Sequence, residues 1–437
     1  MFSRKYRAAT ACFTAVAFLT GFAALAVVPT LPTAVADLHG LPLFPLVAGC
    51  FVAAGLLGGV LGGTWSDRSG ARAPLAAGLL LTVATLLVSA AAGTVWQLAA
   101  GRFLDGLAAG AVAVATNAAI GQAYPERLRG RVLALLSGCW VVPSLVGPPI
   151  AGLVSEAWSW RAVFYGLAVL TALPALLLVP VLRRLGAPAA PAAAAAADRS
   201  RPSLPTAVLV SVGAAVCQYG TAARDAVHLL ALTAGGALLV AFAPRLLPAG
   251  TWRAVRGLPA TVLLRGLSSG TFFTLEAYVP LMLITERHVA PVVSGLAFTG
   301  AAVAWAGASW VQGNLLDGVP RHRVVALGAT VLAAATALAV LGSLPAAPAL
   351  TAAPAMPVAA IGMGLLAPAL TVLSLTHSPA GREGHTSSAM QTNQNLGQIA
   401  VLALASAALG LGDYPTAFAL LAVPALLLAA LAVRTKG

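Results

Sequence analysis

Charge is the property that this sequence has least of. Charged residues make up 8% of its 437 residues, and hydrophobic residues make up 59%. A water-soluble domain cannot bury that much apolar surface, whereas a lipid bilayer solvates it. Lysine occurs only at Lys5 and Lys436, which excludes the Gly-Lys-Ser/Thr phosphate loop of an ATPase.

Cysteine and histidine are too few and too scattered to form a metal or catalytic site. The four cysteines lie far apart, at positions 12, 50, 139 and 217, inside apolar segments. The six histidines form no His-Glu-x-x-His pattern and no Ser-His-Asp group at membrane depth. We therefore expect no metal, no cofactor and no enzymatic activity.

Long apolar segments occupy nearly all of the chain. A helix needs about 20 such residues to cross the hydrocarbon core, and a backbone in lipid must satisfy its own hydrogen bonds. The sequence therefore predicts an all-α membrane protein with fourteen transmembrane helices. The predicted segments are 9–34, 43–64, 73–93, 96–120, 131–153, 162–182, 205–222, 227–247, 258–284, 291–313, 323–343, 350–376, 388–411 and 415–433. The seventh and eighth are short, and without them the count would be twelve.

The basic residues predict the orientation. If the N-terminus is cytoplasmic, only Arg161, Arg224 and Arg287 fall in outer loops, Arg102 and Arg265 are embedded, and all other Lys and Arg residues are cytoplasmic. This bias follows the positive-inside rule and predicts two cytoplasmic termini in a plasma (inner) membrane. The net charge of +13 then faces an anionic lipid leaflet, so we expect no nucleic-acid partner.

The organisation of the chain suggests two bundles. Residues 183–205 are rich in Ala and Pro and resemble a linker. We expect an N-terminal six-helix bundle (1–182), a cytoplasmic linker (183–205), an inserted helix pair (206–257) and a C-terminal six-helix bundle (258–437). The tripeptide Ala34-Val35-Ala36 is also typical of signal-peptide cleavage sites, but the long segment before it favours an uncleaved first helix.

A short pattern occurs once in each half, after the second and the tenth segment. In both copies a glycine is followed four positions later by an aspartate, and then by basic residues. The first copy contains Gly63, Asp67, Arg68, Gly70 and Arg72, and the second contains Gly313, Asp317 and Arg321. Parallel repeats of this kind mark one large class of secondary transporters. We call residues 63–72 and 313–323 the clasp loops.

The first clasp loop resembles the signature Gly-x-x-x-Asp-Arg/Lys-x-Gly-Arg-Arg/Lys of the major facilitator superfamily, from which it departs at Ala71. The resemblance implies a cytoplasmic gate, in which the charges hold the two bundles together and separate when the bundles rock. Gly70 would turn the chain where another residue would be strained.

The segment 96–120 resembles a second signature of the superfamily, with an embedded arginine followed by close-packing glycines. Arg102 and Asp105 are three residues apart and share a helix face. An embedded charge is costly unless it is paired or hydrated. The two side chains therefore either face a cavity or neutralise each other as a structural pair.

The segment 131–153 resembles the glycine-proline signature of exporters in the superfamily. Proline kinks a helix, and glycine allows close packing beside the kink. The alternative is the general enrichment of both residues in membrane helices. The matching residues are Gly138, Pro143, Gly147, Pro148 and Gly152.

The segment 388–411 resembles the fourteen-helix drug/proton antiporters. Its amide side chains, Gln391, Asn393, Gln394 and Asn395, either line a cavity or bond between helices. That family usually has an aspartate ten residues before the proline of a Leu-Pro-Thr segment. Here the proline is Pro32 and the aspartate is replaced by Phe22, so any proton-coupling role must lie elsewhere.

Four charged residues are predicted to lie deep in the membrane: Arg102, Asp105, Arg265 and Glu276. Asp105 and Glu276 lie about 12–14 Å from the outer ends of their helices at 1.5 Å per residue. Two carboxylates at matching depth, one per bundle, predict a proton and substrate site that also includes Arg102. Arg265 is close enough to the inside to extend there, and we assign it no role. Phe272, Phe273 and Tyr278 flank Glu276 and either contact a lipophilic cation or pack the core.

Taken together, these patterns predict a monomeric, proton-coupled exporter that moves small lipophilic or cationic compounds by alternating access. Its partners would be the substrate, protons and the lipid bilayer. An exporter of one metabolite or sugar is the nearest alternative. A polytopic membrane enzyme or a channel is less consistent with the repeated bundles and the lack of a catalytic cluster.

Reporter fusions test the predicted topology. If segments 205–222 and 227–247 both span the membrane, alkaline phosphatase fused at position 224 should be active and green fluorescent protein fused at position 250 should fluoresce. Cytoplasmic signals at both positions would instead reduce the count to twelve.

Overall fold

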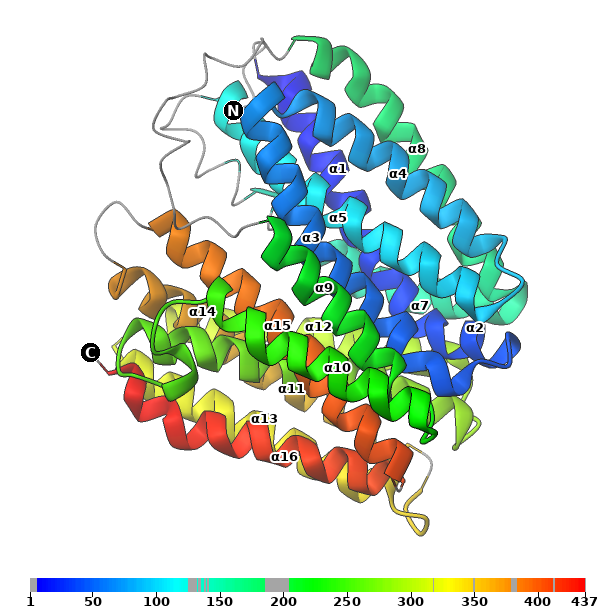
Figure 1. Cartoon of the computed structure of the whole chain (residues 1–437), viewed down its shortest axis with the longest axis vertical. Helices are drawn as coiled ribbons and strands as arrows, with labels where there is room; N and C mark the ends of the chain where they lie inside the picture. The colour runs from blue at the N-terminus through cyan, green and yellow to red at the C-terminus, as the bar shows by residue number, and fades with distance from the viewer. Residues whose placement is uncertain are drawn as a thin grey trace.

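The computed structural model describes residues 6–124, 132, 135–136, 139, 141–184, 204–316, 318–348, 350–378, 383–411 and 413–436, apart from a few side chains such as that of Asp67. In these residues the secondary structure is helical, with no strand. The helices form two groups that converge at one end (Figure 1). We call this the far end, and the opposite end, where both chain termini lie, the terminal end.

The helices match the fourteen predicted segments, each of which contains helix. The N-terminal group consists of α1 (Arg7–Val27), α2 (Leu31–Asp37), α3 (Phe44–Ser69), α4 (Arg72–Ala90), α5 (Val95–Ala123), α7 (Val141–Ala157) and α8 (Trp160–Arg184). Between the groups lie α9 (Leu204–Tyr219) and α10 (Ala226–Phe242). The C-terminal group consists of α11 (Leu258–Thr285), α12 (Pro291–Asn314), α13 (Arg321–Ser343), α14 (Ala355–Thr376), α15 (Glu383–Leu411) and α16 (Tyr414–Leu431). A 3-10 turn at 28–30 joins α1 and α2 into one span, and ten spans within the described residues are long and apolar enough to cross a membrane.

Glycines bring α3 and α5 into close contact. A Cβ atom on Gly106 of α5 would overlap the carbonyl oxygen of Phe51 on α3. A Cβ atom on Gly110 would overlap the carbonyl oxygen of Gly55 in the same way. Small residues at such crossings let helix backbones approach closely, which is the main source of helix association in lipid.

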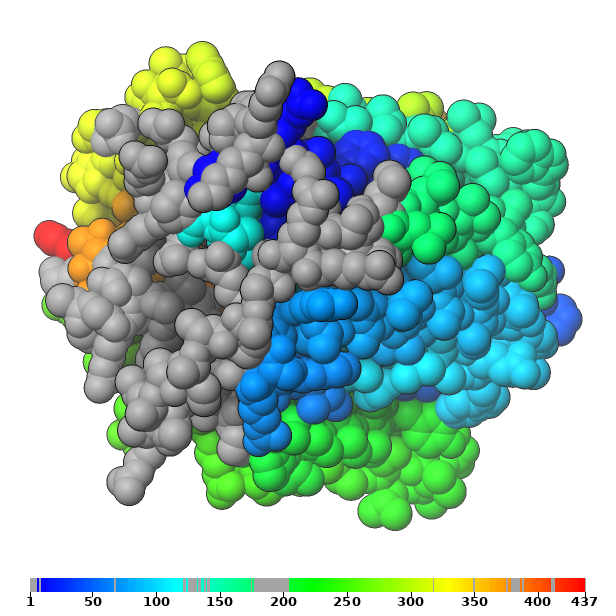
Figure 2. All heavy atoms as spheres, turned by 90° about the horizontal axis from the view of Figure 1, so that it is seen from above, coloured from blue at the N-terminus to red at the C-terminus, as the bar shows by residue number. Residues whose placement is uncertain are grey.

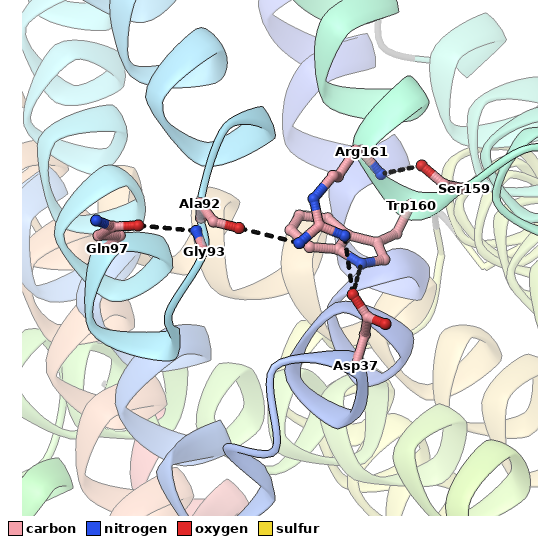
Figure 3. A network of polar contacts seen from close by, with 7 residues as sticks. All are labelled: Asp37, Ala92, Gly93, Gln97, Ser159, Trp160 and Arg161. Atoms are coloured by element: carbon pink, nitrogen blue, oxygen red, sulfur yellow. Dashed lines mark hydrogen bonds and ion pairs between the residues drawn. The ribbon is translucent and has the colours of Figure 1, made fainter.

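A polar network fastens the far end of the N-terminal group (Figure 3). The Asp37 carboxylate at the end of α2 accepts hydrogen bonds from the indole nitrogen of Trp160 (2.9 Å) and from Nη1 of Arg161 (2.8 Å). Arg161 Nη2 also donates to the carbonyl oxygen of Ala92, between α4 and α5 (3.1 Å). The network thus ties α2, the α4–α5 connection and the start of α8 together.

The C-terminal group is fastened similarly at its far end. Arg287, between α11 and α12, donates to the carbonyl oxygens of Gly342 (3.3 Å), Leu344 (2.6 Å) and Ala347 (3.1 Å). These carbonyls lie at and just after the end of α13, where a helix leaves its last oxygens without partners. The two arginines therefore serve structural roles within their own groups.

The two groups are packed together at the far end. Residues from both belong to one continuous apolar core there, and the ring centroids of Phe44 on α3 and Tyr278 on α11 are 5.9 Å apart. On α7 and α12, Gly152 lies against Pro291, and the Thr299 hydroxyl donates to the carbonyl oxygen of Leu145 (2.8 Å). Toward the terminal end the groups diverge in Figure 1, and a second apolar core there contains only N-terminal residues.

The inserted helix α9 covers the line of contact between α3 and α15. The Ser211 hydroxyl donates to the carbonyl oxygen of Ala53 on α3 (2.7 Å), and Gln218 packs against Gly49. Its contact with α15 is apolar, since Ala214 shares a cluster with Ile399. In Figure 2, α9 and α10 form the green surface along the lower edge, beside the blue helices of the N-terminal group. The predicted division at residues 205 and 257 stays a prediction.

The α3–α5 crossing yields a stability prediction. Gly106→Ala should lower the free energy of unfolding by about 1–3 kcal/mol, because the added methyl group overpacks the crossing. Gly236→Ala on α10 is the matched control, since no atom lies within 4 Å of a Cβ at Gly236. Thermal unfolding of the purified protein should show a loss for the first variant only. Equal unfolding temperatures would contradict the close packing.

Candidate substrate and proton site

Four side chains on α11 form a stripe that contains both embedded charges of the C-terminal group. They are three or four residues apart, so they share one face of the helix. We call Arg265, Ser269, Phe272 and Glu276 the α11 stripe.

Glu276 is partly exposed, whereas its neighbours Leu275 and Tyr278 are buried. It lies nine residues before the end of α11 at Thr285, or about 14 Å along the helix axis. No described side chain forms an ion pair or a hydrogen bond with its carboxylate. An embedded carboxylate without a protein partner is costly, which makes Glu276 a candidate for exchange with protons or cations.

An aromatic cluster borders Glu276. The Phe272 ring lies 5.2 Å from the Phe273 ring and 5.2 Å from the Trp305 ring on α12. Tyr278, which the sequence suggested as a third member, instead hydrogen bonds to Ser406 on α15 (2.7 Å) and packs in the core. The cluster thus comes from two helices, and Trp305 was missed because only the fold brings it to α11.

Arg265 is the second charge of the stripe. Its Nε and Nη2 atoms donate to Oε1 of Gln394 on α15 (2.9 and 2.7 Å). Its Nη1 makes a longer contact of 3.5 Å with the carbonyl oxygen of Ala367 on α14. The guanidinium is therefore held between three helices and does not extend to the terminal end, and no described carboxylate pairs with it.

The amides of α15 divide into two sets. Asn393 Nδ2 donates to the carbonyl oxygen of Val262 on α11 (2.5 Å), and Gln394 accepts from the guanidinium described above. These two bond between helices. Gln391 is exposed, and its amide donates to Oδ1 of Asn395 one turn away (3.2 Å).

Arg102 and Asp105 form an ion pair inside the N-terminal group. Arg102 Nη1 lies 2.7 Å from Asp105 Oδ2, and the two residues are 3% and 7% exposed. The guanidinium also lies over the ring of Phe51 on α3, 4.4 Å from its centroid. The two charges neutralise each other in this state, which leaves the α11 stripe with the embedded charges that have no ion-pair partner in the described part of the chain.

The predicted exporter segment lies at the contact between the groups. Phe22, which stands in place of the expected aspartate, lies 3.8 Å from a Cβ position at Gly147 of α7, so this region is apolar. Gly138 lies outside the described residues, and Pro143, Gly147, Pro148 and Gly152 are buried in α7.

The clasp loops lie at the terminal end. Gly70 has a φ of +79°, which agrees with the expected turn, and Arg68 and Arg72 are exposed. Asp317 and the side chain of Asp67 lie outside the described part of the chain. A Cβ atom at Gly63 would make only an ordinary contact with Val114, one at Gly313 would meet nothing within 4 Å, and Arg321 is half-buried. The gate formed by these loops remains a prediction.

Comparison with known proteins agrees with this architecture. The family model described as Major Facilitator Superfamily matches residues 13–402. The chain belongs to the major facilitator superfamily. The family match and the long apolar helices together make it a multi-pass membrane protein.

Several members of the superfamily resemble the chain in sequence. A probable multidrug-efflux transporter of Mycobacterium tuberculosis (strain ATCC 25618 / H37Rv) is 31% identical over 316 residues, which cover 70% of this chain and 66% of that protein. The match thus spans just under two thirds of the relative's length. A multidrug resistance protein of Escherichia coli O157:H7 is 30% identical over 162 residues, covering 36% of this chain and 41% of its own.

Solved structures share the fold. A crystal structure of the peptide transporter POT in complex with alafosfalin superposes with a TM-score of 0.72 at 17% identity, covering 98% of this chain and 96% of that one. The transporter PepTSo gives a TM-score of 0.71 at 13% identity, covering 98% and 97%. At this identity the likeness concerns the major facilitator fold alone.

A double-mutant cycle tests the buried pair. Asp105→Asn or Arg102→Gln alone should destabilise the protein by about 3–5 kcal/mol, because each leaves one charge buried without its partner. The double variant should be more stable than either single variant. Thermal unfolding of all four proteins measures the coupling, and additive losses would show that the pair does not act as a unit.

Proposed function

We propose that the protein is a proton-coupled antiporter that exports small lipophilic or cationic compounds. The observation that carries this proposal is Glu276, an embedded and partly exposed carboxylate without a partner among the described residues. The names of the relatives, a probable multidrug-efflux transporter and a multidrug resistance protein, support the substrate class.

In this proposal a proton and a cationic substrate compete for Glu276. The ionised carboxylate attracts a cation, and the aromatic cluster beside it offers ring faces to a lipophilic one. Protonation of Glu276 removes the charge and weakens the hold on the cation. Antiport follows if the two ligands occupy the site in turn and on opposite sides of the membrane. Arg102 and Asp105 would take part only if motion of the bundles separates them.

The arrangement of the two groups supports alternating access. They are packed at the far end and diverge at the terminal end, which we propose is cytoplasmic because it carries most of the described basic residues. In the state described here the two groups would then be farther apart on the cytoplasmic side than on the outer side. Rocking of the groups would bring the clasp loops together and close that side. We propose that the transporter works as a monomer in the plasma membrane.

Glu276→Gln tests the coupling, because glutamine resembles the protonated acid. Proteoliposomes that contain this variant should fail to move a cationic dye against its gradient when a pH gradient is applied. Exchange down the dye gradient should persist at high dye concentration, since it needs no proton and is limited only by the weaker binding of the cation. Dye fluorescence under an imposed pH gradient, with and without a protonophore, measures both activities.

The matched control is Glu286→Gln. Glu286 follows α11 directly and is exposed, so its neutralisation should leave uphill transport unchanged. If Glu276→Gln still drives uphill transport at the wild-type rate, Glu276 does not couple protons and Asp105 becomes the next residue to test. If the wild type itself ignores the pH gradient, proton antiport is wrong.

A further inference from the structure

The α11 stripe combines two opposite charges that lack ion-pair partners among the described residues. Glu276 is partly exposed, and Arg265 is half-buried. In the N-terminal group, by contrast, Arg102 and Asp105 neutralise each other at 2.7 Å. A site built only for a cation would not need an unneutralised guanidinium on the same helix face, since that charge repels cations.

The bonds of Arg265 hold its guanidinium in place but do not neutralise it. Gln394 accepts from Nε and Nη2, and an amide oxygen carries no net charge. A guanidinium has five N–H donors, and these bonds use two of them, with a third in the long contact to Ala367. The remaining donors suit a carboxylate, which matches the planar guanidinium geometry.

We propose that Arg265, oriented by Gln394, binds the anionic end of a zwitterionic substrate whose cationic end lies at Glu276. The proposal rests on the proposed function for Glu276 and adds the requirement for an acid group. Arg265 would thereby set specificity within the transported compounds, while Gln394 would act as a positioning residue.

The distance between the two charges of the α11 stripe indicates the size of the substrate. Arg265 and Glu276 are eleven residues apart, or about 16 Å along the helix axis. The two charged groups are closer than this if their side chains extend toward each other. Between them lie Phe272, with its ring against Trp305, and Ser269, whose buried hydroxyl has no hydrogen-bond partner in the described part of the chain. An aromatic scaffold with an acid at one end and an amine at the other would match this order of groups along α11.

A pair of dyes that differ only in the acid group tests the proposal. Rhodamine B carries a cationic ring system and a carboxylate, whereas its ethyl ester carries the cation alone. The purified full-length protein should bind rhodamine B about tenfold more tightly than the ester, as measured by fluorescence anisotropy. Arg265→Gln should abolish this preference by weakening rhodamine B binding while leaving ester binding unchanged.

Two further variants separate recognition from folding. Gln394→Glu places a carboxylate on the guanidinium, so it should remove the preference for rhodamine B without lowering the unfolding temperature. Arg287→Gln is the control, because Arg287 bonds to carbonyl oxygens at the far end and lies off the stripe. It should keep the preference even if the unfolding temperature falls.

The outcomes also distinguish this proposal from proton coupling. Wild-type protein that holds rhodamine B no more tightly than its ester, or binds neither dye, overturns the proposal. An equal loss of affinity for both dyes in Arg265→Gln also overturns it, since Arg265 would then have a structural role. Glu276→Gln should weaken the binding of both dyes to a similar extent, so that the ratio of the two affinities stays the same. Loss of uphill transport in that variant bears only on proton coupling.

Discussion

The structure depends on one constraint, which is that a charge or a polar group in lipid must find its partner within the protein. Most of the polar side chains described above satisfy it. Arg102 pairs with Asp105, Arg161 and Arg287 donate to carbonyl oxygens, and Asn393 bonds across to α11. Against this background Glu276 stands out as an embedded carboxylate without a partner among the described residues, and this is why the proposed site is placed there.

The same constraint explains what could be read from the sequence. The helices were predictable because each apolar run is long enough to cross a bilayer and has no other stable conformation there. The Arg102–Asp105 pair was predictable as one of two options because both residues lie on one helix. The positive φ of Gly70 followed from a turn pattern in the chain itself. In each case the interaction is local.

Contacts between helices were not predictable in this way. Gln394 meets Arg265 and Trp305 meets Phe272 only because α11, α12 and α15 are rotated so that these faces oppose each other. An apolar helix with small residues on several sides gives little indication of its rotation. The hydrogen bonds of Arg265 were missed for this reason, since its distance from the helix end suggested an extended side chain. Tyr278 was assigned to the aromatic cluster because it is near Glu276 in sequence, yet it points to Ser406.

The position of α9 makes the two contacts between the helix groups different. On one flank α7 and α12 touch directly, whereas on the other α9 stands beside the contact between α3 and α15. Its hydrogen bond from Ser211 anchors it to α3, and its apolar contact with α15 resists sliding only weakly. Any movement of α15 against α3 must therefore also carry α15 past α9, which stays bonded to α3.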